Sequence, residues 1–451
     1  MDYSKLDTNI DYIIGSDEEL TSETLTDFIK KHQAHVDTIF RSFDRAYRGL
    51  YDIFTQQKKA QYKPDNRIAV NFAKYITDTF NGFFIGNPIK ITTDEKSVDD
   101  YVSFVNAYNN IESADFEIAK MMSIFGKAYE MYYIDNNGKI AIAQFTPLNA
   151  FMIYDDSLLK RPRYFVYTYQ DKDKHVHGSI SDNRVVKWFD MSNGFKWESE
   201  EKPHGFGYVP AYEWVENKEK MCIFQSALPA INEFNKALSE KANDVDYFAD
   251  AYLKILGTEL DETKLNTLRD NRIINFEGED ADKLIVDFLQ KPNADNIQEN
   301  LLNRLNTLIF QQSMVANISD ENFGASSGVA LKYKLLAMSN LAKNKENQFR
   351  AGLDNRYKII FSNAINSIGA DDWTKLRYTF SPNIPNNETE EAQIAGALAG
   401  ITSKRTQLSV LSVVDNVEDE IKRIEEEQNN TGYMPDYPTA RTAEADDGDE
   451  Q

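Results

Sequence analysis

A block of short strand-like segments at residues 127–215 lies between segments of helical periodicity, and this arrangement most constrains the fold. The block contains KAYEMYYID, KIAIAQF, RYFVYTYQ and RVVKWFDM, which are short and rich in aromatic and β-branched residues. The tetrapeptide DNNG at 135–138 is typical of a hairpin turn. The block therefore predicts an antiparallel sheet packed on helices, within a predominantly helical α+β fold.

Helices are expected before this block because apolar residues recur at helical spacing. The clearest case places Asp65 at the N-cap and Gly82 at the stop of one helix. A second helix is expected at about 113–126. The apolar stripe of the first helix recurs every four residues and consists of Ile68, Phe72, Ile76 and Phe80.

Longer helices are expected after the block. One spans about 228–255, a second 294–316 and a third about 329–367. The intervening stretch 257–293 mixes a short helix with strand-like pieces, as in a small α/β subdomain. A helical hairpin broken around Gly400 follows the third helix, and the acidic tail beyond residue 430 has a composition typical of disorder.

The overall charge excludes several classes of function. With 72 acidic against 50 basic residues the formal charge is −22, so tight non-specific binding to a phosphate backbone is not expected.

Cys222 is the only cysteine, which excludes a disulfide framework and a thiolate metal cluster. The N-terminus lacks the features of a signal peptide, and no apolar run approaches the roughly 20 residues of a membrane span. A soluble protein is expected.

Two helices have unusual surfaces. The helix at 294–316 has one apolar face, expected to carry Ile297, Leu301, Leu305, Leu308, Ile309 and Val315. Its opposite face is rich in neutral polar residues, namely Asn300, Asn303, Asn306, Thr307 and Gln311. The helix after it carries seven basic residues against Glu346 and Asp354: Lys332, Lys334, Lys343, Lys345, Arg350, Arg356 and Lys358. Such charge segregation suggests an assembly in which basic segments meet acidic ones on neighbouring copies.

A small, flexible loop separates these two helices. In NFGASSGVALKYKL, Gly324 and Gly328 bracket Ala325, Ser326 and Ser327. A phosphate-binding P-loop is excluded, because the two glycines are too close together, Val329 rather than lysine follows the second, and no strand precedes the loop.

A magnesium-dependent nuclease is an alternative, because Asp65 with Asp94, Glu95 and Lys96 fits a loose acidic-pair-plus-lysine pattern. A helix-capping role for Asp65 is favoured over that reading. His175 and His177 alternate on an expected strand and could ligate a metal, but no completing carboxylate arrangement is apparent nearby in the sequence. The histidine pairs are therefore interpreted as exposed residues, and no metal site, cofactor or catalytic residue is expected.

Four stretches together resemble the portal proteins of tailed double-stranded DNA bacteriophages, in the family common among long-tailed phages of Gram-positive hosts. They occur in family order and are spread over most of the chain. They are DNRIAVNFAKYITDTFNGFFIGNPIKI (65–91), IFGKAYEMYYID (124–135), DENFGASSGVALKYKL (320–335) and ITSKRTQLSVLSVVDNVEDEIKRIEEE (401–427).

This resemblance implies a non-enzymatic ring, normally a dodecamer, through which double-stranded DNA passes at one capsid vertex. It divides the chain into a wing, a stem, a clip, a tunnel loop and a crown. The implied ranges are 1–225 with 329–375 for the wing, 226–254 and 294–316 for the stem, 255–293 for the clip, 317–328 for the tunnel loop and 376–430 for the crown. The tail is 431–451.

The resemblance also implies which residues meet DNA or a neighbouring subunit. The tunnel loop would present Asp320, Glu321, Asn322, Phe323, Gly324, Ala325, Ser326, Ser327 and Gly328 to the channel. Channel-lining or intersubunit roles would fall to Asn300, Asn303, Thr307, Gln311, Lys332 and Lys334. The two lysines could either soften the repulsion of DNA or pair with a neighbour, and both options stay open.

The implied partners are the terminase large subunit, the head–tail adaptor, the scaffold protein and the major capsid protein, with no membrane. The ring would assemble in the host cytoplasm and end in the virion. Besides the nuclease, a soluble helical scaffold that does not bind DNA is a further alternative.

Overall fold

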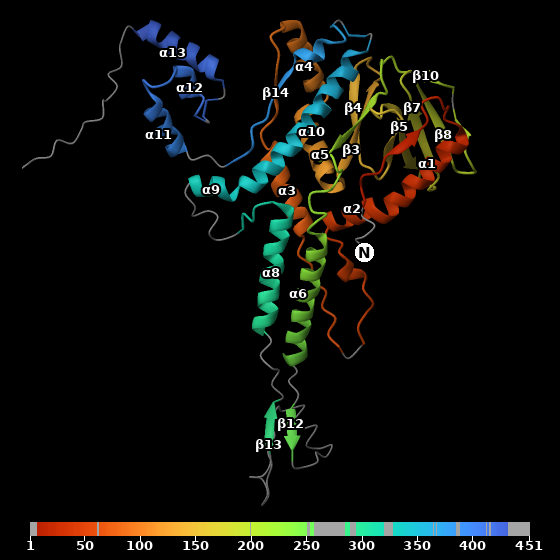
Figure 1. Cartoon of the computed structure of the whole chain (residues 1–451), viewed down its shortest axis with the longest axis vertical. Coiled ribbons are helices and arrows are strands. Elements are labelled where there is room, and N and C mark those ends of the chain that lie inside the picture. The colour runs from red at the N-terminus through yellow and green to blue at the C-terminus, as the bar shows by residue number, and fades with distance from the viewer. Residues whose placement is uncertain are drawn as a thin grey trace, which may run out of the picture. The chain divides into compact units, whose positions relative to one another are not determined.

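The computed structural model divides the chain into two compact units, Met1–Asn383 and Ile384–Gln451 (Figure 1). The part that the structure describes is a mixed α+β fold, about half of it helical, as the α+β prediction requires. The described residues are 7–60, 63–198, 200–249, 253–256, 285–288, 295–319, 328–363, 365–366, 368–384, 388–411, 413–414 and 416–431.

The block expected to form one antiparallel sheet is divided between two sheets, and the larger is a seven-stranded sheet in the first unit. Its order is β1-β5-β6-β7-β8-β10, with β9 also paired to β8. Only the β1–β5 pair is parallel. Phe151, Phe165 and Phe189 are buried in the core of this sheet, which α1 (Ser22–His35) covers with Leu25. The strands are β1 (Tyr12–Ile14), β5 (Ala150–Asp155), β6 (Pro162–Gln170), β7 (Val176–Ser181), β8 (Val185–Asp190), β9 (Lys196–Trp197) and β10 (Lys202–Pro203).

A second sheet of three strands contains the hairpin expected at 135–138. Its order is β11 (Ala211–Val215), β3 (Lys127–Ile134) and β4 (Ile140–Phe145). Asp135 accepts backbone N–H bonds from Asn137 and Lys139, both at 2.9 Å. Gly138 has φ +69°, a conformation that glycine adopts without strain. The hairpin prediction is confirmed.

Helices complete the first unit, together with a small sheet of β2 (Lys90–Thr92) and β14 (Arg377–Thr379). The helix expected at 113–126 is confirmed as α5 (Ile111–Phe125), which ends at Gly126 with φ +79°. The remaining helices are the π-helical turn η2 (Val36–Phe40), α2 (Arg41–Tyr47), η3 (Asp52–Thr55), α3 (Phe72–Ile85), α4 (Lys96–Tyr108), α6 (Leu228–Ala249), α8 (Asp295–Ser313), α9 (Gly328–Lys334), α10 (Leu336–Phe361) and η5 (Asp372–Lys375).

The prediction for the start and end of α3 is wrong. The helix begins after Asn71, whose side chain accepts a hydrogen bond from the Lys74 N–H, and Gly82 lies inside it. Asp65 caps nothing and instead forms an ion pair with Arg67 at 3.0 Å. The cause is that residues 66–70 lie in extended conformation along α6, which supplies their hydrogen-bond partners.

The basic helix after the loop also differs from expectation. It is divided at Leu335 into α9 and α10, and it ends at Phe361 because Asn366 donates a hydrogen bond to the Ile360 carbonyl at 2.6 Å.

Two basic side chains of this helix form ion pairs inside the same chain rather than with a neighbouring copy. Lys345 forms a buried ion pair with Glu216 at 2.7 Å, and Arg356 contacts Glu130 at 2.7 Å. The inference of intersubunit charge pairing is therefore wrong for Lys345 and Arg356.

The second unit is helical, as expected. It contains α11 (Glu388–Leu398), α12 (Lys404–Leu408) and α13 (Val417–Thr431). Gly400 lies between α11 and α12 with φ +77°, so the expected break is confirmed. Arg405 pairs with Glu418 at 2.8 Å. Across both units, none of the described helices is long and apolar enough to cross a membrane.

Candidate channel site

The candidate site is built on α6 and α8, which lie side by side (Figure 1). Two polar contacts fix one helix on the other. Lys241 of α6 pairs with Glu299 of α8, and the Gln298 amide donates to Asp244 at 2.8 Å. Because both contacts join the same stretch of each helix, they set the rotation of α8 about its own axis.

The buried face of α8 contains Leu302, Ile309 and Ser313, which are at most 7% exposed. At 3.6 residues per turn, the side opposite these residues carries the neutral polar side chains singled out from the sequence. All four are exposed: Asn300, Asn303, Thr307 and Gln311. Arg304 shares this exposed side, and the sequence reasoning missed it although its spacing from Asn300 is one helical turn.

The predicted apolar face of α8 is partly wrong. Ile297 and Leu301 are 71% and 49% exposed, and Asn306 is half-buried rather than on the open side. Ile309 is buried as expected. The difference arises because the hydrogen bond from Gln298 to Asp244 turns the side of α8 that carries Gln298 toward α6. Ile297 and Leu301 then lie beside the neutral face.

On its other side, α6 carries a buried polar row that the apolar pattern did not predict. Asn235, Ser239 and Asn243 are at most 5% exposed. They accept hydrogen bonds from the backbone N–H groups of residues 70, 68 and 66, at 2.8, 2.9 and 2.6 Å respectively. The long helix expected to reach Ile255 ends at Ala249, and Ile255 lies in β12 (Leu253–Leu256), which pairs with β13 (Ile285–Phe288).

The C-terminal end of α8 is held against α3. Phe310 packs edge-on to Phe72 and Tyr75, with ring centroids 5.9 and 5.7 Å apart. The Tyr75 hydroxyl also accepts the N–H of Ile318 at 3.0 Å. The chain that leaves α8 is therefore anchored to α3 at the start of the expected loop, 317–328.

The loop residues themselves lie mostly outside the described residues. Only Gly328, the first residue of α9, is described among the nine candidates that begin at Asp320. Lys332 and Lys334 are exposed on α9, and between them Tyr333 is 75% exposed.

The structure does not bring the nuclease candidates together. Asp65 pairs with Arg67, whereas Asp94 pairs with Arg377 at 3.1 Å. Among the described residues, neither carboxylate belongs to a cluster of three side chains that could hold a metal ion.

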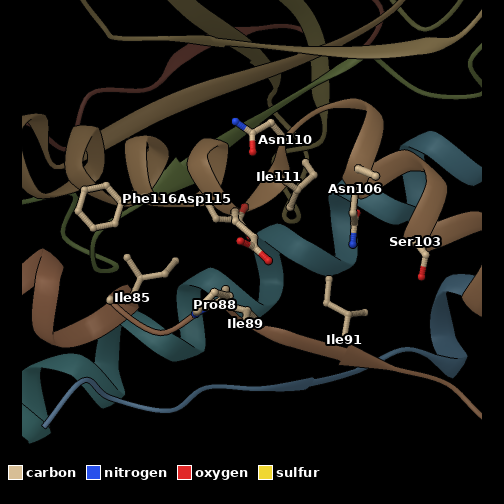
Figure 2. A pocket seen from close by; sticks show the side chains of 13 residues that line it. Ile85, Pro88, Ile89, Ile91, Ser103, Asn106, Asn110, Ile111, Asp115 and Phe116 are labelled. Atoms are coloured by element: carbon tan, nitrogen blue, oxygen red, sulfur yellow. The ribbon is translucent and has the colours of Figure 1, made fainter. Parts of the chain in front are cut away.

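A separate cavity of about 520 Å³ lies between α4, α5 and the segment after α3, and Figure 2 shows Asp115 among its lining residues. Burial raises the pKa of Asp115 to about 6, although Arg356 opposes this shift through a contact at 2.7 Å. Arg356 pairs with this carboxylate and with Glu130, and Glu112 also lines the cavity. Its walls combine apolar side chains such as Ile89 and Ile111 with the polar side chains of Ser103, Asn106 and Asn110.

Residues 26–432 match the family described as phage portal protein, SPP1 Gp6-like. The chain belongs to this family. It is 24% identical over 429 residues to the portal protein of Bacillus phage SPP1, covering 87% of this chain and 82% of that protein. It is also 24% identical over 395 residues to the portal protein of Clostridium phage phiCD119, covering 81% of this chain and 85% of the relative.

Membership of this family gives the chain its function. A phage portal protein is the channel at one capsid vertex through which DNA is packaged and ejected, and it forms a ring in the virion. The family is not enzymatic, which excludes the nuclease alternative, and passage of DNA excludes the scaffold without DNA. The recognition from the four sequence motifs is confirmed.

Proposed function

We propose that α6 and α8 form the stem that lines the DNA channel, with α8 facing the DNA. The carrying observation is that Asn300, Thr307 and Gln311 are exposed opposite the buried face of α8. Neutral amides can touch phosphates without holding them, whereas each lysine or arginine that neutralises a phosphate adds a barrier to movement. An acidic chain whose lining is largely neutral, apart from Arg304, is suited to passing DNA through.

A ring of about twelve copies requires each stem to contact its neighbours. Ile297 and Leu301 flank the neutral face and are largely exposed. In a single copy they are not buried and so contribute little to stability. Packing them against the next copy would remove apolar area from water, at about 25 cal/mol per Å². Val245 on α6, 64% exposed, offers the same kind of surface for a neighbouring subunit.

The remaining parts are assigned from the family resemblance together with the order of elements along the chain. The β12–β13 pair beyond the stem belongs to the clip, which docks the terminase large subunit and later the head–tail adaptor. The sheets at the N-terminal side with α10 form the wing, which meets the scaffold and major capsid proteins. The helices α11 to α13 form the crown, and residues 317–328 form the tunnel loop, with Lys332 and Lys334 behind it.

Packaging assays on rings with altered loops test the tunnel-loop assignment. Replacing Gly324 and Gly328 together with leucine should leave ring assembly intact and lower the amount of DNA packaged, because bulky side chains restrict a loop that changes shape as DNA advances. The same pair replaced with alanine provides a graded control with a smaller effect. If the leucine pair packaged normally while forming rings, this stretch would not be the tunnel loop.

The lining assignment is tested by adding charge to the neutral face. Asn303→Lys should slow packaging, and higher salt should relieve the defect, because the new contact is electrostatic. Asn303→Asp has the same exposed position and the opposite charge, so it should not slow packaging in this way. Equal behaviour of the two variants would argue that Asn303 does not face the DNA.

A further inference from the structure

A cluster of imidazole and carboxylate groups lies at one edge of the seven-stranded sheet, away from α6 and α8. His177 on β7 is the cross-strand partner of Asp190 on β8. Glu198 follows β9 directly and donates its backbone N–H to the Trp188 carbonyl at 2.9 Å. Three neighbouring strands therefore bring one imidazole and two carboxylates together, and the register of the sheet fixes their backbones.

The side chains already converge. The His177 Nδ1 atom lies 2.8 Å from a Glu198 carboxylate oxygen and 3.8 Å from one of Asp190. One ligand atom from each of the three residues lies within 4.8 Å of the other two. A tetrahedral zinc ion holds its nitrogen and oxygen ligands at about 2.0–2.2 Å, so small side-chain rotations would close this set around one ion.

The other nitrogen of His177 is also positioned. Its Nε2 atom lies 3.3 Å from Asp171, whose second oxygen accepts the backbone N–H groups of Asp173 and His175 at 2.9 and 2.8 Å. Metal-binding histidines usually donate their second N–H to such a carboxylate, which fixes the ring and strengthens the ligand. Tyr169 stacks on the His177 ring at 5.6 Å and holds its plane.

Hydrogen bonds orient the carboxylates of the cluster. Their negative charge exceeds the positive charge of the neighbouring side chains. Asp190 accepts the backbone N–H of Ser192 at 2.7 Å, which fixes its direction. Lys196 is its cross-strand partner on β9 and contributes one positive charge. Asp171, Asp190 and Glu198 together carry three negative charges, so a divalent cation would relieve their mutual repulsion.

We propose that His177, Asp190 and Glu198 bind one divalent transition-metal ion of the zinc class, with Asp171 as the positioning residue behind His177. One nitrogen and two carboxylate oxygens favour Zn²⁺, Ni²⁺ or Co²⁺ over Mg²⁺, which prefers an all-oxygen octahedral site. The ion would join β7, β8 and the chain after β9, and would stabilise this edge of the sheet. The inference rests on these residues alone and does not depend on the channel assignment.

The test is zinc binding to the full chain without a polyhistidine tag, measured by calorimetry after treatment with chelator. One Zn²⁺ per chain should bind, the thermal unfolding temperature should rise with zinc, and magnesium at the same concentration should do neither. Substitution by Co²⁺ gives a second readout, since its visible absorption bands report on the number and geometry of the ligands.

Matched variants separate this site from neighbouring groups. His177→Gln should abolish stoichiometric zinc binding, and Asp171→Asn should weaken it by about 10-fold. His175→Gln disrupts the neighbouring group of Asp171, Asp173 and His175, so zinc binding equal to that of the parent would assign the ion to His177. If His177→Gln is poorly folded by circular dichroism in the absence of metal, Glu198→Gln at a more exposed position replaces it. Absence of stoichiometric binding by the parent, or unchanged binding by His177→Gln or Glu198→Gln, would overturn the proposal.

Discussion

The Ser239 hydroxyl accepts a hydrogen bond from the backbone N–H of Ile68, at 2.9 Å, and so joins two segments 171 residues apart. Asn235 and Asn243 do the same for Val70 and Asn66. Four helical residues rise about 6 Å, and two extended residues advance about 6.6 Å. This near match lets every fourth side chain of α6 bind every second N–H of residues 66–70.

Ser239→Ala should lower the free energy of unfolding by about 1–2 kcal/mol, because the Ile68 N–H loses its acceptor in a partly buried place. Hydrogen exchange should also become faster at the amide of Ile68, since the extended segment opens more easily. Urea unfolding and exchange followed by mass spectrometry measure the two effects.

The control for this prediction is Lys236→Ala, at an exposed position of the same helix. It should change the stability by less than about 0.5 kcal/mol and leave the exchange of Ile68 unaltered. If Ser239→Ala behaved like this control, the polar row would not hold the segment.

Lys345 and Glu216 provide a prediction on buried charge. Burial lowers the pKa of the Lys345 ammonium and raises that of the Glu216 carboxyl, although their contact at 2.7 Å opposes both shifts. Glu216→Gln should cost about 3–5 kcal/mol, because Lys345 would keep an uncompensated charge in the interior. Chemical denaturation of the single variant tests this cost.

The double variant Lys345→Met with Glu216→Gln should recover most of that loss, since no buried charge remains. The comparison of single and double variants gives the coupling between the two residues. A double variant as unstable as Glu216→Gln alone would show that the cost comes from packing or from the Ser123 hydrogen bond of Lys345.

The sequence pattern correctly predicted elements that depend only on residues close together in the chain. The hairpin at 135–138 and helix α5 follow from turn chemistry and apolar spacing, and both are present. The start of α3 could not be predicted in this way, because residues 66–70 take their hydrogen-bond partners from α6. Likewise, a lysine such as Lys345 is expected at the surface. Only the fold shows that its carboxylate partner, Glu216, lies on a distant segment.

The candidate site was predicted in composition but only partly in orientation. The exposure of Asn300, Asn303 and Thr307 follows from their spacing, whereas their contact with DNA remains a prediction. The exposure of Ile297 depends on how α8 is rotated against α6, which the apolar pattern alone does not determine. The partners of His177 were also missed, since the sheet register decides that Asp190 lies opposite it.

Gly352 lies where α10 crosses Trp214, and this gives a prediction on packing. A Cβ atom at residue 352 would lie 2.3 Å from the buried indole, so Gly352→Ala should destabilise by about 1–3 kcal/mol. Gly82, also helical, has open space around its Cβ position, and Gly82→Ala should stabilise by about 0.5–1 kcal/mol. Opposite signs in urea unfolding are expected, and a stabilising Gly352→Ala would contradict the close packing.

Glu213 gives the sheet an acid-sensitive centre. Its carboxylate accepts hydrogen bonds from Tyr154 at 2.8 Å and Tyr129 at 3.1 Å, and it pairs with Lys220 at 2.8 Å and Lys127 at 3.4 Å. Burial alone would raise the pKa of Glu213, but the two lysines and the Tyr154 hydroxyl outweigh it and lower the pKa to about 2. The folded protein therefore favours the ionised form.

The pH dependence of stability follows from this shift. Because the pKa of Glu213 is lower in the folded chain than its ordinary value of 4.5, its contribution is present above that pH and is lost as the pH falls toward 2. A shift of this size corresponds to about 3 kcal/mol. Glu213→Gln should be less stable at neutral pH, since Lys127 loses its buried partner, and should lose about 3 kcal/mol less than the parent between pH 5 and pH 2. Glu219→Gln, an exposed position of the same segment, is the control and should follow the parent curve. Parallel curves for Glu213→Gln and the parent in urea unfolding across this range would show that another group causes the acid sensitivity.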